Sequence, residues 1–190
     1  MKKLTTALFV GLMFLTGLAH AETFDTLLPN RSTVGFRITE MGVPVNGGFK
    51  RFSASLRFDP SHPATAKLTV DVDVASIDAG SSEANDTALE APWFDSKRYP
   101  TARFVAKSVK ALGDGRYQAV GELSIKGRSQ NVVVPFTFVE QAGVARFDGS
   151  LQIKRTDFAI GAGEWADPSL VANEVVIVFH IEAAGTAARP

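Results

Sequence analysis

The chain has 190 residues, and its 20 basic and 20 acidic residues give a formal net charge of zero at pH 7. Because it carries no excess of basic residues, nucleic acids and anionic membrane surfaces are not indicated as its main targets. It contains no cysteine, which excludes disulfides, zinc–thiolate sites and cysteine nucleophiles.

The first 21 residues have the pattern of a secretory signal peptide. Lys2 and Lys3 precede a mainly apolar run over 7–19, and Ala19-His20-Ala21 provides a small-x-small cleavage site. No later segment approaches the roughly 18 consecutive apolar residues of a membrane span. We therefore expect residues 1–21 to be removed and residues 22–190 to form one soluble periplasmic domain. That part keeps 18 basic residues, 20 acidic residues and 12 of the 14 phenylalanines.

Alternating apolar and polar residues predict a series of strands beyond the leader. In the segment 67–76, for example, Leu68, Val70 and Val72 share one face and polar residues lie between them. Turn-forming pairs such as Lys126-Gly127 separate the segments. The pattern predicts eight strands, over 32–39, 48–58, 67–76, 102–109, 116–124, 131–139, 145–154 and 174–183.

Two connections are too long to be simple hairpin turns. The first, 77–100, contains a short predicted helix with Ser81 or Ser82 as its N-cap and Pro92 at its end. The second, 159–173, is expected to be irregular. Loops of this length in a compact β domain usually serve a function or cover an opening.

The predicted strands 131–139 and 174–183 are apolar on both faces. The second apolar face needs a cover, such as another sheet, the helix or a partner subunit, unless one face lines an internal cavity. Eight antiparallel strands can close into a barrel whose interior holds a ligand. A sandwich of the same eight strands is the structural alternative.

Catalysis and metal binding have few candidate residues. His62 lies in a proline-flanked turn and His180 near the end of the last strand, and neither lies in a recognisable catalytic motif. Their isolation also argues against a metal site. Asp71 and Asp73 are expected to be solvated rather than to bind calcium. We expect no catalytic residues, no metal and no cofactor.

The stretch 155–165, RTDFAIGAGEW, combines charged and aromatic residues. If the alternation of the strand 145–154 continues, Arg155 and Asp157 lie on its apolar face. They would then pair with each other or with neighbouring strands near a barrel end. As an alternative, Arg155 would meet a phosphate or quinone oxygen of a ligand at the rim.

Six short motifs occur in order along the chain, and together they resemble the YceI-like family of periplasmic polyisoprenoid-binding proteins. The resemblance covers essentially the whole of 22–190. The motifs are STVGF at 32–36, GFKRF at 48–52, VASID at 74–78, WFD at 93–95 with YPTARF at 99–104, GELSIKG at 121–127, and RTDF at 155–158.

The resemblance implies a lipocalin-like, eight-stranded antiparallel barrel with a helix near one end. It also implies a homodimer and a long isoprenoid chain in the apolar interior. The continuation GAGEW at 161–165 is similar to a branch of the family associated with b-type cytochromes. This similarity implies a quinone-like ligand and a membrane cytochrome as a partner.

We therefore expect a non-enzymatic periplasmic carrier of an isoprenoid-type lipid. One alternative is a non-enzymatic interaction module that is a partner of a membrane b-type cytochrome, in which the same aromatic residues form a packed core. Another is a hydrolase that uses His180. Arg155 and Asp157 are the candidates for the rim. The predicted tunnel residues are Phe36, Phe58, Trp93, Phe94, Phe104, Phe136, Phe138, Phe147, Phe158 and Trp165.

Overall fold

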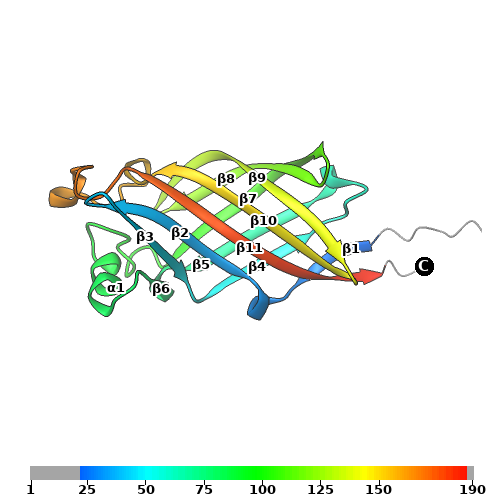
Figure 1. The fold of residues 1–190 in the computed structure, drawn as a ribbon, viewed down its shortest axis with the longest axis horizontal. Coiled ribbons are helices and arrows are strands. Elements are labelled where there is room, and N and C mark those ends of the chain that lie inside the picture. The colour runs from blue at the N-terminus through cyan, green and yellow to red at the C-terminus, as the bar shows by residue number, and fades with distance from the viewer. Residues whose placement is uncertain (1–21, 188–190) are drawn as a thin grey trace, which may run out of the picture.

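A computed structural model describes residues 22–187 as an antiparallel β-sheet that curls into an elongated barrel with one α-helix (Figure 1). The predicted signal peptide, 1–21, lies outside the described residues. The strands are β1 Glu22–Leu27, β2 Thr33–Glu40, β3 Val43–Phe49, β4 Phe52–Arg57, β5 Lys67–Asp73, β6 Ile77–Asp78, β7 Thr101–Gly113, β8 Arg116–Ile125, β9 Arg128–Gln141, β10 Val144–Lys154 and β11 Glu174–Ala187.

The predicted all-β, lipocalin-like antiparallel barrel is confirmed. The eight predicted strands appear as β2, β4, β5 and β7 to β11, and the structure adds β1, β3 and β6. Most connections are tight turns, and several contain a single turn of 3₁₀ helix. These turns are η1 Pro29–Arg31, η2 Pro63–Thr65, η3 Val74–Ser76, η4 Arg155–Phe158 and η5 Gly163–Ala166.

The short helix predicted in 77–100 is also confirmed, as α1 Ser82–Leu89. Ser81 is its N-cap, because its side chain accepts a hydrogen bond from the Ala84 backbone N–H at 3.1 Å. The helix lies at the end of the barrel opposite to β1 (Figure 1). No helix within 22–187 has the length and apolarity of a membrane span.

Closure of the sheet depends on β1, which the sequence pattern did not reveal. The ladder runs β4-β5-β7-β8-β9-β10-β11-β2-β3-β6, and β1 pairs with the last part of β11. Phe24 of β1 also exchanges two backbone hydrogen bonds with Phe58, just after β4, at 2.9 and 3.0 Å. β1 therefore bridges β11 and the first strand of the ladder at one end of the barrel.

Aromatic rings fill the lumen at this closed end. Phe24 is fully buried, and its ring lies 5.7 Å from that of Phe138, which in turn lies 5.1 Å from that of Phe58. Such tilted and edge-to-face contacts stabilise beyond simple burial. We call this group the aromatic plug; its members are Phe24, Phe58, Tyr117, Phe136, Phe138 and Phe147.

We expect Phe24→Ala to lower the free energy of unfolding by about 3–5 kcal/mol, because it removes a buried ring and leaves a cavity in the plug. Urea denaturation followed by tryptophan fluorescence measures the change. Val139→Ala, on the exposed outer face, is the control and should change stability by about 0.5 kcal/mol or less. A similarly small effect for Phe24→Ala would show that the plug does not stabilise the closed end.

Candidate ligand-binding cavity

A cavity of about 760 Å³ lies inside the barrel. Its volume is within the range of roughly 300–1,000 Å³ that is typical of small-molecule sites. The alternation of each strand directs one apolar face inward, as β5 and β11 illustrate. Their inward residues are Leu68, Val70 and Val72 on β5, and Val175, Ile177, Phe179 and Ile181 on β11.

Glycines on the inner wall help to keep the cavity open. Gly149 on β10 lies directly opposite Phe179 on β11, and a Cβ atom at residue 149 would collide with the Phe179 ring. The ring therefore lies against the wall instead of crossing the lumen. Gly47 repeats this arrangement opposite Phe36. Gly121 lies opposite Ala106, but a Cβ atom there would likewise collide with a ring, that of Phe104.

The ten aromatic residues predicted for the tunnel occupy three kinds of position. Eight line the cavity, although Phe58, Phe136 and Phe147 also belong to the aromatic plug. Phe138 does not line the cavity, because its ring packs within the plug. Phe158 is almost fully buried in a separate cluster with Leu123, Ile125 and Ile160. Contact between any of them and a ligand stays a prediction.

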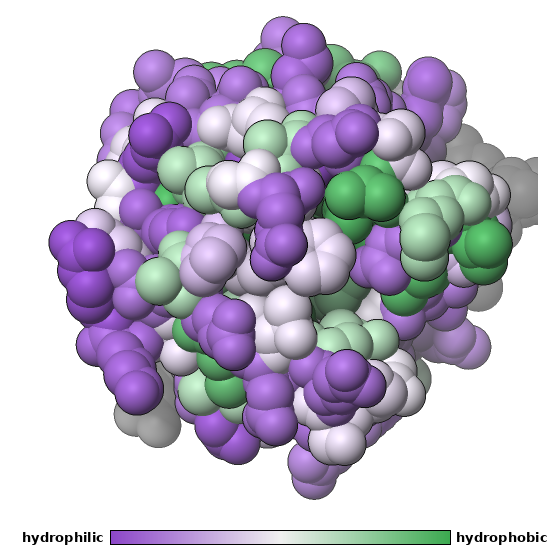
Figure 2. Space-filling view, turned by 90° about the vertical axis from the view of Figure 1, so that its left-hand side faces the viewer, coloured by the Kyte–Doolittle hydropathy of each residue, from purple (hydrophilic) through white to green (hydrophobic). Residues whose placement is uncertain are grey.

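The two long connections meet at the end of the barrel opposite the plug, which we call the mouth (Figure 1). Trp93 follows α1 and Trp165 lies in η5, and their ring centroids are 5.6 Å apart. Phe94 packs edge-on against Phe49 at 6.1 Å. Figure 2 looks onto this end, where polar side chains surround apolar ones and a small hollow. Both connections therefore contribute aromatic residues to the mouth.

Of the pairings expected for Arg155 and Asp157, the one between the two residues themselves is wrong. β10 ends at Lys154, and 155–158 form the 3₁₀ turn η4. Because this turn has about three residues per turn, positions two apart no longer share a face. Asp157 is exposed, and no ion pair joins it to Arg155 in the part of the chain that the structure describes. Asp157 therefore does not face the cavity.

Arg155 is instead buried among backbone carbonyl groups, with 1% of its surface exposed. A guanidinium has five N–H groups, and all five donate here to carbonyl oxygens of the second long connection. Burial lowers the pKa of the guanidinium. No N–H is left for a ligand head group. Nε donates to Ala172 at 3.1 Å, Nη1 to Ile160 and Gly161 at 2.9 Å each, and Nη2 to Trp165 at 2.6 Å and Val171 at 2.8 Å.

A second cation, Lys126, ties the two long connections together. Its ammonium group donates to the carbonyl oxygens of Ala91 at 2.8 Å, Pro92 at 3.3 Å and Ala159 at 2.8 Å. Desolvation lowers its pKa. All three N–H groups are thus used to fix the mouth. The sequence pattern indicated only a turn at 126–127, because the three acceptors are backbone groups more than 30 residues away.

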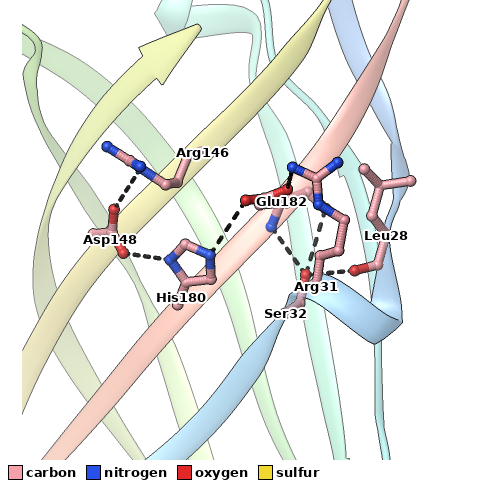
Figure 3. A network of polar contacts seen from close by, with 7 residues as sticks. All are labelled: Leu28, Arg31, Ser32, Arg146, Asp148, His180 and Glu182. Carbon is pink, nitrogen blue, oxygen red and sulfur yellow. Dashed lines mark hydrogen bonds and ion pairs between the residues drawn. The ribbon is translucent and has the colours of Figure 1, made fainter. Parts of the chain in front are cut away.

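His180, the candidate base of the alternative hydrolase, lies on the outer face of the barrel (Figure 3). Its Nδ1 is 2.6 Å from Asp148 and its Nε2 is 3.5 Å from Glu182, so both ring nitrogens face carboxylates. Arg146 and Arg31 pair with these carboxylates from outside. Ser32, the serine in this network, donates to the Leu28 carbonyl and accepts from the Glu182 backbone N–H, and no hydrogen bond joins it to His180 among the described residues. No group of three or more histidine and acidic side chains in 22–187 is arranged to hold a metal ion.

An antiparallel barrel around an apolar cavity defines a lipocalin-like protein. The chain belongs to the family of the YceI-like domain, which matches residues 26–183. A UPF0312 protein of Azotobacter vinelandii is 27% identical, and the matched region covers 96% of this chain and 97% of that protein.

Solved structures share the fold. BcnA of Burkholderia cenocepacia is 41% identical, with a TM-score of 0.82 over 83% of this chain and 99% of that one. A polyisoprenoid binding domain from Saccharophagus degradans, implicated in plant cell wall breakdown, is 15% identical. Its TM-score is 0.65 over 88% of this chain and 99% of that one, which shows a common fold.

We expect Arg155→Met to lower the free energy of unfolding by about 3 kcal/mol or more, because five carbonyl groups lose their donor. The affinity of the folded variant for an apolar fluorescent probe should not change. Denaturant unfolding and fluorescence titration test the two parts. Arg155→Lys is the control, and it should recover only part of the stability because an ammonium has three donors. Normal stability with a large loss of affinity would instead assign Arg155 to the ligand.

Proposed function

We propose that this protein is a periplasmic, non-enzymatic binding protein that carries a long apolar lipid of the isoprenoid type in its barrel. The observation that supports this most is the cavity of about 760 Å³, whose wall consists mainly of inward apolar side chains. Such a wall offers dispersion contacts along its length and few polar partners. It therefore suits a hydrocarbon chain better than a compact polar molecule.

The energetics favour a chain of several isoprene units. Moving each methylene from water into the cavity contributes about 0.8 kcal/mol. Association itself costs about 4–15 kcal/mol, so a short chain would bind weakly and a longer one tightly. Inward residues such as Ala54, Ile177 and Phe179 are only partly buried, and they line the cavity. Covering this apolar surface is the driving force that we propose.

The chemical class of the ligand rests on the family and on one neighbour. The Saccharophagus degradans domain is named for polyisoprenoid binding, and it shares the barrel fold. The leader pattern of 1–21 supports a periplasmic location. A quinone-like ligand, a homodimer and a membrane cytochrome partner stay predictions from the resemblance in sequence.

The two alternatives have less support. An interaction module would need an interior filled by its own aromatic side chains, whereas a large volume is free of them. A hydrolase would need His180 beside a nucleophile and a cleft. His180 lies instead on the outer wall between two carboxylates.

Organic extraction of the purified protein followed by mass spectrometry should identify a bound isoprenoid-type lipid. Ala54→Trp places an indole in the cavity, so it should remove this lipid and lower the affinity for an apolar probe at least tenfold. Val133→Trp, on the outer wall, is the matched control and should retain both. Circular dichroism checks that both variants fold. Full lipid retention in a folded Ala54→Trp protein would contradict the interior site.

A further inference from the structure

Three large apolar side chains reach the surface beside the mouth. Met41 is 76% exposed, Val43 61% and Leu170 40%. Met41 and Val43 belong to the β2–β3 hairpin, whereas Leu170 comes from the second long connection. We call these three residues the apolar rim. Green side chains among the polar ones are visible at this end in Figure 2.

The backbone holds the apolar rim in place. The Met41 N–H donates to the Leu170 carbonyl at 2.8 Å, and the Ala172 N–H donates to the Thr39 carbonyl at 2.8 Å. Arg155 fixes the same connection through the carbonyl groups of Val171 and Ala172. Hydrogen bonds therefore hold in place both segments that carry the apolar rim, the β2–β3 hairpin and the second long connection.

The apolar rim is continuous with the wall of the cavity. Among the described residues, Met41 is the most exposed large apolar residue, and it is also part of the cavity lining. Val171, next to Leu170, also lines the cavity, as does Ile38 below the turn. An apolar path thus runs from the outer surface of the molecule into the lumen.

The turn itself does not require an apolar residue. Glu40 and Val43 pair across a two-residue turn in which Met41 has φ 45° and Gly42 has φ 80°. This left-handed geometry favours Asn, Asp or Gly at the first position. The same position holds Asp114 in the β7–β8 turn, Lys126 in the β8–β9 turn and Ala142 in the β9–β10 turn, all with positive φ. The backbone conformation of Met41 is therefore not unusual, but among these four turns Met41 alone carries a large apolar side chain, and its exposure conflicts with the preference of such side chains for burial.

We propose that the apolar rim inserts into the surface of a lipid bilayer, so that a chain passes between bilayer and cavity without crossing water. This proposal rests on the lipid-binding function of the cavity. Glu40 and Glu83 line the cavity at the mouth, so the contact depends on apolar insertion and not on attraction to anionic lipids. Zwitterionic bilayers should therefore be sufficient.

The test measures transfer of a fluorescent prenyl lipid from phosphatidylcholine vesicles to the protein. For the wild type, the transfer rate should rise in proportion to vesicle concentration, because contact precedes transfer. The double variant Val43→Thr, Leu170→Gln should transfer at least tenfold more slowly, while its affinity for a soluble short-chain apolar probe is unchanged, because neither residue lines the cavity. Both side chains are exposed and Thr suits a strand position, so folding is preserved.

The control variant Val133→Asn, Val139→Gln removes two exposed apolar side chains from the outer wall and should transfer like the wild type. A transfer rate independent of vesicle concentration, or an unaffected rim variant, would overturn bilayer docking. An unaffected rim variant would indicate that the apolar rim contacts a protein partner or a second copy of the chain instead of a bilayer. If the wild type fails to bind even the soluble probe, the cavity function is wrong and the rim proposal falls with it.

Discussion

The pair of backbone hydrogen bonds between Phe24 and Phe58 joins β1 to the first strand of the ladder, and the interior depends on this contact. Without it, an apolar sheet face would open to water at that end. With it, the plug seals one end of the lumen while the glycine positions hold aromatic rings against the wall farther along. The strands close around the remaining volume, and their inward side chains do not fill it, so a cavity is left.

The mouth is stabilised by a different kind of interaction. Arg155 and Lys126 each use all of their N–H groups on backbone carbonyls, which satisfies buried donors and acceptors together. The N–H groups of these two cations therefore hold the long connections in place near the opening. Met41 and Leu170 are exposed at the outer surface of the mouth. Such apolar residues suit a site that receives a hydrocarbon chain and not a charged head group.

Local patterns predicted the inner wall well and its ends poorly. Strict alternation identified Leu68, Val70 and Val72 as one face of a strand, and this face lines the cavity. The same alternation failed at Asp157, because nothing in a period of two marks the residue at which a strand ends. β1 was missed because its sequence, ETFDTL, has few apolar residues, and only pairing with distant strands makes it extended.

The sequence by itself determined the all-β class, most of the strands and the short helix, because these follow from periodicity and capping between near neighbours. The family resemblance was likewise carried by short motifs. Only the tertiary structure decided that Phe138 packs within the plug whereas Phe104 lines a cavity, and that the Arg155 guanidinium is fully occupied. These outcomes depend on distances between residues far apart in the chain. A side chain's inward direction is a local property, whereas the space left in front of it is set by all the strands together.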